Sequence, residues 1–144
     1  MLRNLNTKRG GFTLVEIMIV VAIIALLAAI AVPNFLRSRK RSQATQVLED
    51  LRIMDAAIDQ YAIENNRGGA GTNGAFVWSD IAKYVKNGTR LYTTMLTNAP
   101  VDILGNSFVS NSSIDSLTRL QINLASYNAL SDVAPMSFWS PYGY

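Results

Sequence analysis

The pattern of the chain is dominated by a long apolar block near its N-terminus. From Phe12 to Leu36 there are 25 residues with a single charge, Glu16, and the run from Ile17 to Val32 is apolar throughout. A helix needs about 20 such residues to cross a bilayer, so the block predicts a transmembrane helix over 12–36. Pro33 lacks a backbone N–H and clashes with the carbonyl of Ala29, so we expect a kink or local unwinding near 29–33.

A second pattern continues this helix through residues 37–65. Apolar side chains recur there at alternating spacings of four and three, which places them on one helical face. We interpret this stripe as the face that packs against a C-terminal domain. With the membrane block, the predicted helix runs over about 50 residues, or roughly 75–80 Å at 1.5 Å per residue. The stripe consists of Val47, Leu51, Met54, Ile58 and Tyr61.

Residues 66–144 predict a small globular domain. A glycine-rich loop over 65–74 ends the long helix, and an aromatic tail over 138–144 is expected to fold back onto the domain. The fold class predicted is α+β, a lollipop in which the long helix packs against a small antiparallel sheet. The elements expected are a helix over Trp78–Lys86 with Ser79 as N-cap and Asn87-Gly88 as stop, strands over 91–96, 107–110 and 120–124, and turns at 105–106 and 111–113.

Composition narrows the possible chemistry. The chain has no cysteine and no histidine, so it lacks a disulfide, a thiolate nucleophile and the commonest general base at neutral pH. The acids after Asp102 are only Asp115 and Asp132, whereas calcium usually takes six to eight oxygens. We therefore expect no enzyme, no cofactor and no metal site.

The net charge of +3 could suggest a nucleic-acid partner, but the position of the basic residues argues against one. Three of the thirteen basic residues, Arg3, Lys8 and Arg9, lie in the first eleven positions. Without them ten basic residues face ten acidic ones, so the remainder is formally neutral. The basic excess belongs to a leader, and no specific nucleic acid is expected.

Two details qualify the membrane interpretation. Glu16 is a carboxylate inside an apolar block, which costs free energy unless it has a partner. The chain also changes abruptly from basic to apolar at Gly10-Gly11-Phe12, where a protease could cut ahead of the apolar run. An ordinary signal peptide stays an alternative, because Ala29-Ile30-Ala31 offers a cleavage site that would leave Val32 first.

The stretch Lys8-Arg9-Gly10-Gly11-Phe12-Thr13-Leu14-Val15-Glu16, with the apolar run that follows and Pro33, resembles the class III signal of type IV pilins and type II secretion pseudopilins. The resemblance implies cleavage between Gly11 and Phe12 by a prepilin peptidase on the cytoplasmic face. It also implies N-methylation of Phe12 and a mature helix that forms the core of a filament. The segments implied are a leader over 1–11, a filament-core helix over 12–36, its amphipathic continuation over 37–65 and a globular domain over 66–144.

The resemblance gives Glu16 an assembly role. Phe12 and Glu16 are four residues apart and share a helix face, and a carboxylate in the first turn is favoured by the helix dipole. In a filament, Glu16 of an incoming subunit would neutralise the Phe12 amine of its neighbour. Many type IV pilins carry a glycine where Ala25 stands, so unwinding over all of 25–33 is less expected here.

One segment of the sequence bears on the choice between a secretion pseudopilus and a surface pilus. Asp102-Ile103-Leu104-Gly105-Asn106-Ser107-Phe108 resembles a turn of type II secretion pseudopilins, although it lacks the usual proline and tryptophan. A secretion pseudopilin is slightly favoured, with a surface type IV pilus subunit and an exported binding module as alternatives.

The implied partners are copies of the chain, a prepilin peptidase/methyltransferase, an inner-membrane assembly platform, minor pilins, and membrane lipid before assembly. The implied location is the inner membrane, crossed once with the C-terminal domain outside the cytoplasm, and then a periplasmic pseudopilus or a surface pilus. The basic cluster Arg37, Arg39, Lys40 and Arg41 is interpreted as a solvated or headgroup-facing collar. Contact with acidic residues of neighbouring subunits is the alternative.

Overall fold

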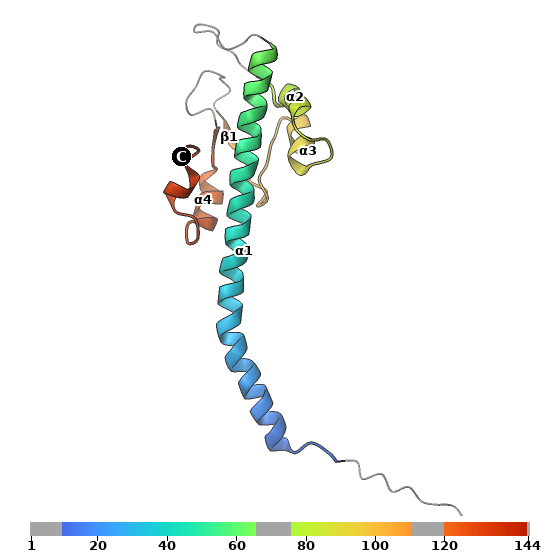
Figure 1. Ribbon diagram of the computed structural model, residues 1–144, viewed down its shortest axis with the longest axis vertical. Helices are drawn as coiled ribbons and strands as arrows, with labels where there is room; N and C mark the ends of the chain where they lie inside the picture. Colours follow the sequence, from blue (N-terminus) through green and yellow to red (C-terminus); the bar gives the residue numbers. More distant parts are fainter. Residues whose placement is uncertain (1–9, 66–75, 111–119, 144) are drawn as a thin grey trace, which may run out of the picture. The chain divides into compact units, whose positions relative to one another are not determined.

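A computed structural model describes residues 10–65, 76–110 and 120–143. Its longest element is helix α1, Leu14–Glu64, which has 51 residues (Figure 1). The chain divides after Arg37 into two compact units, Met1–Arg37 and Ser38–Tyr144. The predicted continuation of the apolar helix beyond residue 36 is confirmed, since α1 runs on to Glu64.

Helix α1 passes through Pro33 without a break in helical structure. The proline removes one donor from the ladder, but the hydrogen bonds of the neighbouring turns are kept. Ala and Leu, which are good helix formers, are frequent in the part of α1 before Pro33, and no glycine occurs between Leu14 and Glu64. Of the kink or local unwinding expected near 29–33, the unwinding is therefore wrong, because a single missing bond is not enough to open an otherwise continuous helix, whereas the kink stays a prediction.

The core of the second unit forms on one face of α1. The predicted stripe is confirmed, since Val47, Leu51, Met54 and Ile58 are fully buried and Tyr61 is 8% exposed. Figure 1 shows the short elements of the unit on both sides of this part of α1. The stripe organises the domain because removing large apolar side chains from water is the main favourable term in folding.

A short helical segment follows Val77. Helix α2, Trp78–Ile81, continues directly into the 3₁₀ helix η1, Ala82–Tyr84. The predicted helix over Trp78–Lys86 is thus present in shortened form, but Ser79 is not its N-cap. Val77 occupies that position with no side-chain cap, and the backbone N–H of Ser79 instead donates to Asn98 Oδ1 at 3.1 Å.

The strand expected over 91–96 is wrong. These residues form helix α3, Arg90–Leu96, whose N-cap Thr89 accepts a hydrogen bond from the Tyr92 N–H. Leu91 and Met95, four residues apart, both point into the core. Tyr and Thr residues favour strands, but strand propensity depends on packing context, and here the cap and the shared buried face decide for a helix.

The antiparallel sheet is small. Strands β1, Val109–Ser110, and β2, Leu120–Gln121, pair with Val109 opposite Gln121 and Ser110 opposite Leu120. An isolated antiparallel bridge joins Val101 to Ser107. The two strands expected over 107–110 and 120–124 are therefore present but shorter, and the predicted α+β class is confirmed.

The C-terminal part returns to helix. Leu124, which was expected to end a strand, instead begins helix α4, Leu124–Leu130, and Asn123 caps this helix by accepting a hydrogen bond from the Ala125 N–H. The 3₁₀ helix η2, Met136–Trp139, then carries the aromatic tail back onto the domain. That prediction is confirmed, because Trp139 is fully buried and donates from Nε1 to the Ala134 carbonyl at 3.1 Å. The turn expected at 111–113 and most of the glycine-rich loop lie outside the described residues.

Candidate functional site

The segment that precedes α1 is open. Gly10 and Gly11 are exposed, and a Cβ atom added to either would meet no other atom within 4 Å. The side chain of Phe12 is 84% exposed. The Gly11–Phe12 peptide bond thus lies in exposed, non-helical chain, a position that a protease can reach without unfolding a domain.

Thr13 and Glu16 build the start of the helix together. A Glu16 carboxylate oxygen accepts hydrogen bonds from the Thr13 backbone N–H and from the Thr13 hydroxyl, each at 2.8 Å. In return the Glu16 N–H donates to Thr13 Oγ1 at 3.3 Å. This reciprocal arrangement is a capping box, which satisfies donors that a helix leaves free at its first turn.

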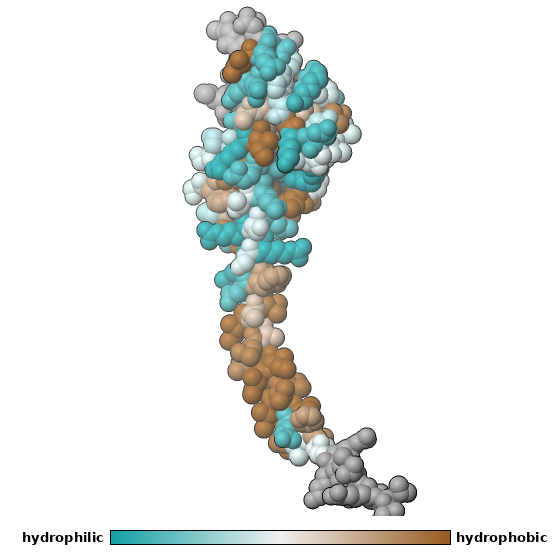
Figure 2. Space-filling model, turned by 45° about the vertical axis from the view of Figure 1, so that its right-hand side comes forward, coloured by the Kyte–Doolittle hydropathy of each residue, from teal (hydrophilic) through white to brown (hydrophobic). Residues whose placement is uncertain are grey.

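The helix that follows carries apolar side chains on all sides. Every large apolar side chain from Phe12 to Leu36 is at least 50% exposed. Among the described residues, α1 is the one helix long and apolar enough to cross a membrane, and none of its most apolar window is buried. Figure 2 shows this part of α1 as an almost continuous brown, hydrophobic surface. Such a surface needs a cover of lipid or protein.

Comparison with known proteins identifies this segment. Residues 6–32 match the prokaryotic N-terminal methylation motif. The chain is 37% identical over 60 residues to the type II secretion system core protein G of Klebsiella pneumoniae, which covers 42% of this chain and 43% of that protein. It is 44% identical over 62 residues to the type IV major pilin protein PilA of Myxococcus xanthus, covering 43% and 28%. The chain is thus similar, over less than half of its length, to a type II secretion core protein and to a type IV pilin, and residues 6–32 carry the methylation motif.

A second pilus protein is also similar to the chain. The type IV wide pilus major component PilA4 of Thermus thermophilus is 48% identical over 56 residues, which is 39% of this chain and 43% of that protein. The chain spans less than half of the length of these curated relatives. No solved structure matches the chain at a significant level.

The structure places the pilin-type residues in two settings. Gly11 and Phe12 lie just outside α1, whereas Glu16 lies in its first turn and Pro33 lies inside it. The carboxylate of Glu16 is bonded to Thr13 and not to Phe12. Sequence reasoning overlooked Thr13, although Thr-x-x-Glu ahead of an apolar run is the usual signature of a capping box.

The four basic residues at 37–41 of α1 differ in whether they form ion pairs. Lys40 forms an ion pair with Asp132 at 2.9 Å, joining α1 to the segment just after α4. Arg39 and Arg41 are exposed, as is Arg37 at the end of the first unit. Among the described residues, no acidic side chain forms an ion pair with these three arginines.

The Asp102 turn is held by hydrogen bonds to the carboxylate of Asp102. Asp102 is 2% exposed, and its Oδ1 accepts from the Leu104 N–H at 2.8 Å and the Asn106 N–H at 2.9 Å. Its second oxygen accepts from the hydroxyl of buried Ser126 on α4. Gly105 supplies the positive φ of 87° that the turn needs. Within the described ranges no three acidic side chains gather in a way that could hold a metal ion.

Two titratable groups of the second unit are shifted. Burial raises the pKa of Asp50, and the bonded guanidinium of Arg90 opposes this rise. Arg90 also donates to the Val101 carbonyl, so it ties α1, α3 and the Asp102 turn together. The pKa of Tyr84 is raised because its hydroxyl donates to Glu64 at 2.6 Å.

Proposed function

We propose that this chain is a structural subunit of a pilin-like filament, cut after Gly11 and N-methylated at Phe12. The observation that carries the proposal is the exposed apolar part of α1, which begins immediately after an open, glycine-containing segment. Lipid covers this surface before assembly, and the same part of other copies covers it afterwards. The methylation motif over residues 6–32 supports processing at this junction.

Processing changes the electrostatics of the helix start. Cleavage converts the Phe12 amide into a positively charged amine, one residue before Thr13 and four before Glu16. The Glu16 carboxylate, held by the capping box, then faces a cation that the precursor lacks. In an assembling filament, Glu16 of one subunit pairs with the Phe12 amine of the next, because surroundings of low dielectric constant penalise an unpaired charge.

The segments take separate roles in this proposal. Residues 1–11 are the leader, 12–36 the membrane and filament-core helix, 37–65 its amphipathic continuation, and 66–144 the globular domain outside the cytoplasm. Pro33 serves assembly by leaving one carbonyl of the helix without its usual donor, so that this turn can adjust when subunits pack. The partners are copies of the chain, the peptidase/methyltransferase, the inner-membrane assembly platform and minor pilins.

A secretion pseudopilus is the first choice of system. The Asp102 turn supports it, as does the similarity to core proteins of type II secretion systems. The surface type IV pilus stays the second candidate, because pilin components of Myxococcus and Thermus are also similar. In either system the role is structural.

The test is the intact mass of the protein in sheared and membrane fractions of the cells. A mass that begins at Phe12 and carries one methyl group supports the proposal. If it occurs in the sheared material, the filament is a surface pilus; if it stays in the membrane pellet, a secretion pseudopilus is favoured. A mass that begins at Val32 contradicts the proposal, because the assembling helix would have been removed by an ordinary signal peptidase.

A further inference from the structure

We propose that Arg39 and Arg41 bind the headgroups of anionic phospholipids and hold the subunit at a defined depth in the membrane before assembly. The inference rests on the membrane insertion of α1 that the proposed function includes. It assigns to these arginines a lipid partner, whereas the alternative is an acidic surface on a neighbouring subunit.

The first argument is depth along α1. From Leu14 to Leu36 the helix has 23 residues, which corresponds to about 35 Å at 1.5 Å per residue. The hydrocarbon core of a bilayer is about 30 Å thick, and each headgroup layer adds roughly 5–7 Å. The basic residues begin at the position after Leu36, and the stretch 37–41 covers about 7 Å. Its length and place therefore match one headgroup layer.

The second argument is distribution around the helix. Successive residues of an α-helix turn by about 100°, so Arg39 lies roughly 200° and Arg41 roughly 40° from Arg37. The side chains of Arg39 and Arg41 are thus about 160° apart and leave α1 on nearly opposite sides. A neighbouring protein would meet one side of the helix, whereas a layer of headgroups surrounds it. The arrangement favours lipid, and the planar fork of arginine suits phosphate oxygens.

The third argument is the bonding of the residue between the two arginines. Lys40 is directed to Asp132 of its own domain at 2.9 Å and is thereby partly neutralised. Arg39 and Arg41 are exposed and form no ion pair with any acid of the described ranges. Their charge is available to an external anion, and basic residues at an anionic membrane surface contribute favourably to binding.

The experiment uses the full-length precursor released from detergent micelles that contain equimolar phosphatidylcholine and phosphatidylglycerol. Native mass spectrometry gives the ratio of the two lipids retained by the protein. The wild type should retain mainly phosphatidylglycerol. The double variant Arg39→Gln/Arg41→Gln should lower the bound ratio of phosphatidylglycerol to phosphatidylcholine by roughly 30-fold, on the basis of the usual contribution of two basic side chains.

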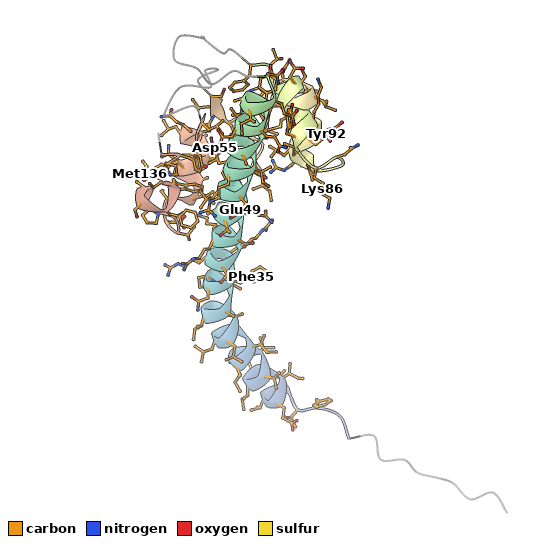
Figure 3. All side chains as sticks on the ribbon, turned by 45° about the horizontal axis from the view of Figure 1, so that its top comes forward. Phe35, Glu49, Asp55, Lys86, Tyr92 and Met136 are labelled. Atoms are coloured by element: carbon orange, nitrogen blue, oxygen red, sulfur yellow. The ribbon has the colours of Figure 1, made fainter. Side chains whose placement is uncertain are left out.

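The matched control is Lys83→Gln/Lys86→Gln, which removes the same charge from exposed positions on and just after η1 (Figure 3 labels Lys86). This control should keep the lipid preference of the wild type. Equal lipid ratios for the arginine variant and the wild type would overturn the inference. A variant that keeps the lipid preference but loses filament assembly would also overturn it and would assign the arginines to an acidic neighbour.

Membrane insertion is checked separately by extracting reconstituted vesicles with alkaline carbonate. Wild type and both variants should stay with the lipid. If the wild type is extracted, membrane insertion itself fails, and with it the proposed function. If all proteins stay in the vesicles but the lipid ratio does not change, only the headgroup contact fails.

Discussion

The Thr13 backbone N–H and the Glu16 carboxylate are joined by a hydrogen bond of 2.8 Å, and the same carboxylate accepts the Thr13 hydroxyl. One acidic side chain therefore has two duties in this chain. It completes the capping of α1, and in the proposed filament it meets the amine that processing creates at Phe12. The two duties can be separated by substitution.

The capping duty is tested by Thr13→Ala. The change removes the hydroxyl bonded to Glu16 but leaves the charge of Glu16 intact. Loss of such an N-cap destabilises a helix by about 0.5–2 kcal/mol. The N–H groups of Glu16 and Ile17, which donate to Thr13 Oγ1 and to the Thr13 carbonyl, should then exchange with deuterium about 2–30-fold faster in the detergent-solubilised precursor. The control Thr45→Ala, whose hydroxyl only donates to the Arg41 carbonyl, should leave these rates unchanged. Equal rates in Thr13→Ala and the wild type would show that the cap contributes nothing.

The assembly duty is tested by Glu16→Gln. The amide keeps a carbonyl oxygen that can accept the Thr13 N–H, but it cannot neutralise the amine of Phe12. We expect normal cleavage after Gly11 and at least a tenfold loss of assembled subunit, corresponding to about 1.4 kcal/mol or more per contact. Assembly is measured as the processed protein that sediments as filaments after shearing or overexpression. Filaments as abundant as those of the wild type would refute the charge pairing.

The buried Asp102 network predicts a large stability effect. Asp102→Ala removes the acceptor for two backbone N–H groups and for the Ser126 hydroxyl, which is fully buried. Bonds to a charged acceptor are worth about 1.5–3 kcal/mol, and an unsatisfied buried group adds its own cost. The free energy of unfolding should fall by roughly 2–4 kcal/mol.

Urea unfolding followed by tryptophan fluorescence measures this loss, because both tryptophans, Trp78 and Trp139, belong to the second unit. The control Asp80→Ala removes a partly exposed acid paired with Lys83 at 3.3 Å. It should change the free energy by no more than about 0.5 kcal/mol, as is usual for surface ion pairs. Similar losses in the two variants would contradict the structural role of Asp102.

Asp50 predicts a pH dependence with a definite sign. Burial raises the pKa of Asp50 above its ordinary value of 3.8, so the folded chain holds this proton more tightly than the unfolded chain. The resulting stabilisation is complete below pH 3.8 and is lost as the pH rises through the folded pKa. The side chain of Asp50→Asn cannot titrate, so the stability of this variant does not change with pH at this position.

The measurement compares the free energies of unfolding of wild type and Asp50→Asn between pH 3.5 and pH 7. The wild type should lose stability relative to the variant as the pH rises. The opposite slope would mean that the Arg90 guanidinium outweighs burial and lowers the pKa of Asp50. Because Asp50 is partly exposed, the pH slope should be well below that of a fully buried carboxyl.

Prediction from the sequence succeeded where the signal was long and periodic. The apolar block and the stripe from Val47 to Tyr61 lie on one helix and extend over many turns, so local errors in single residues do not change the result. It failed for short segments. Leu91–Leu96 contains residues typical of strands, and Leu120–Leu124 continues from a strand into α4 at a cap that the pattern did not reveal.

In the candidate site, too, some residues could be found from the sequence and others could not. Phe12, Glu16 and Pro33 were selected by their place in a recognisable motif, and the structure locates them at and within α1. Thr13 was overlooked, although its signature is local and could have been found. The separation of Lys40 from Arg39 and Arg41 could not have been predicted, because it depends on Asp132, 92 residues further along the chain.

The sequence by itself determined the long helix, its exposed apolar part and the charge at its start, because these properties arise between residues within about four positions of one another. Only the tertiary structure decided that residues 90–96 are helical, that Asp102 is buried against Ser126 and that Lys40 is bound to its own domain. Each of these depends on contacts between segments far apart in the chain. Such contacts stabilise a conformation by burial and hydrogen bonding more strongly than the weak local preference of the residues opposes it.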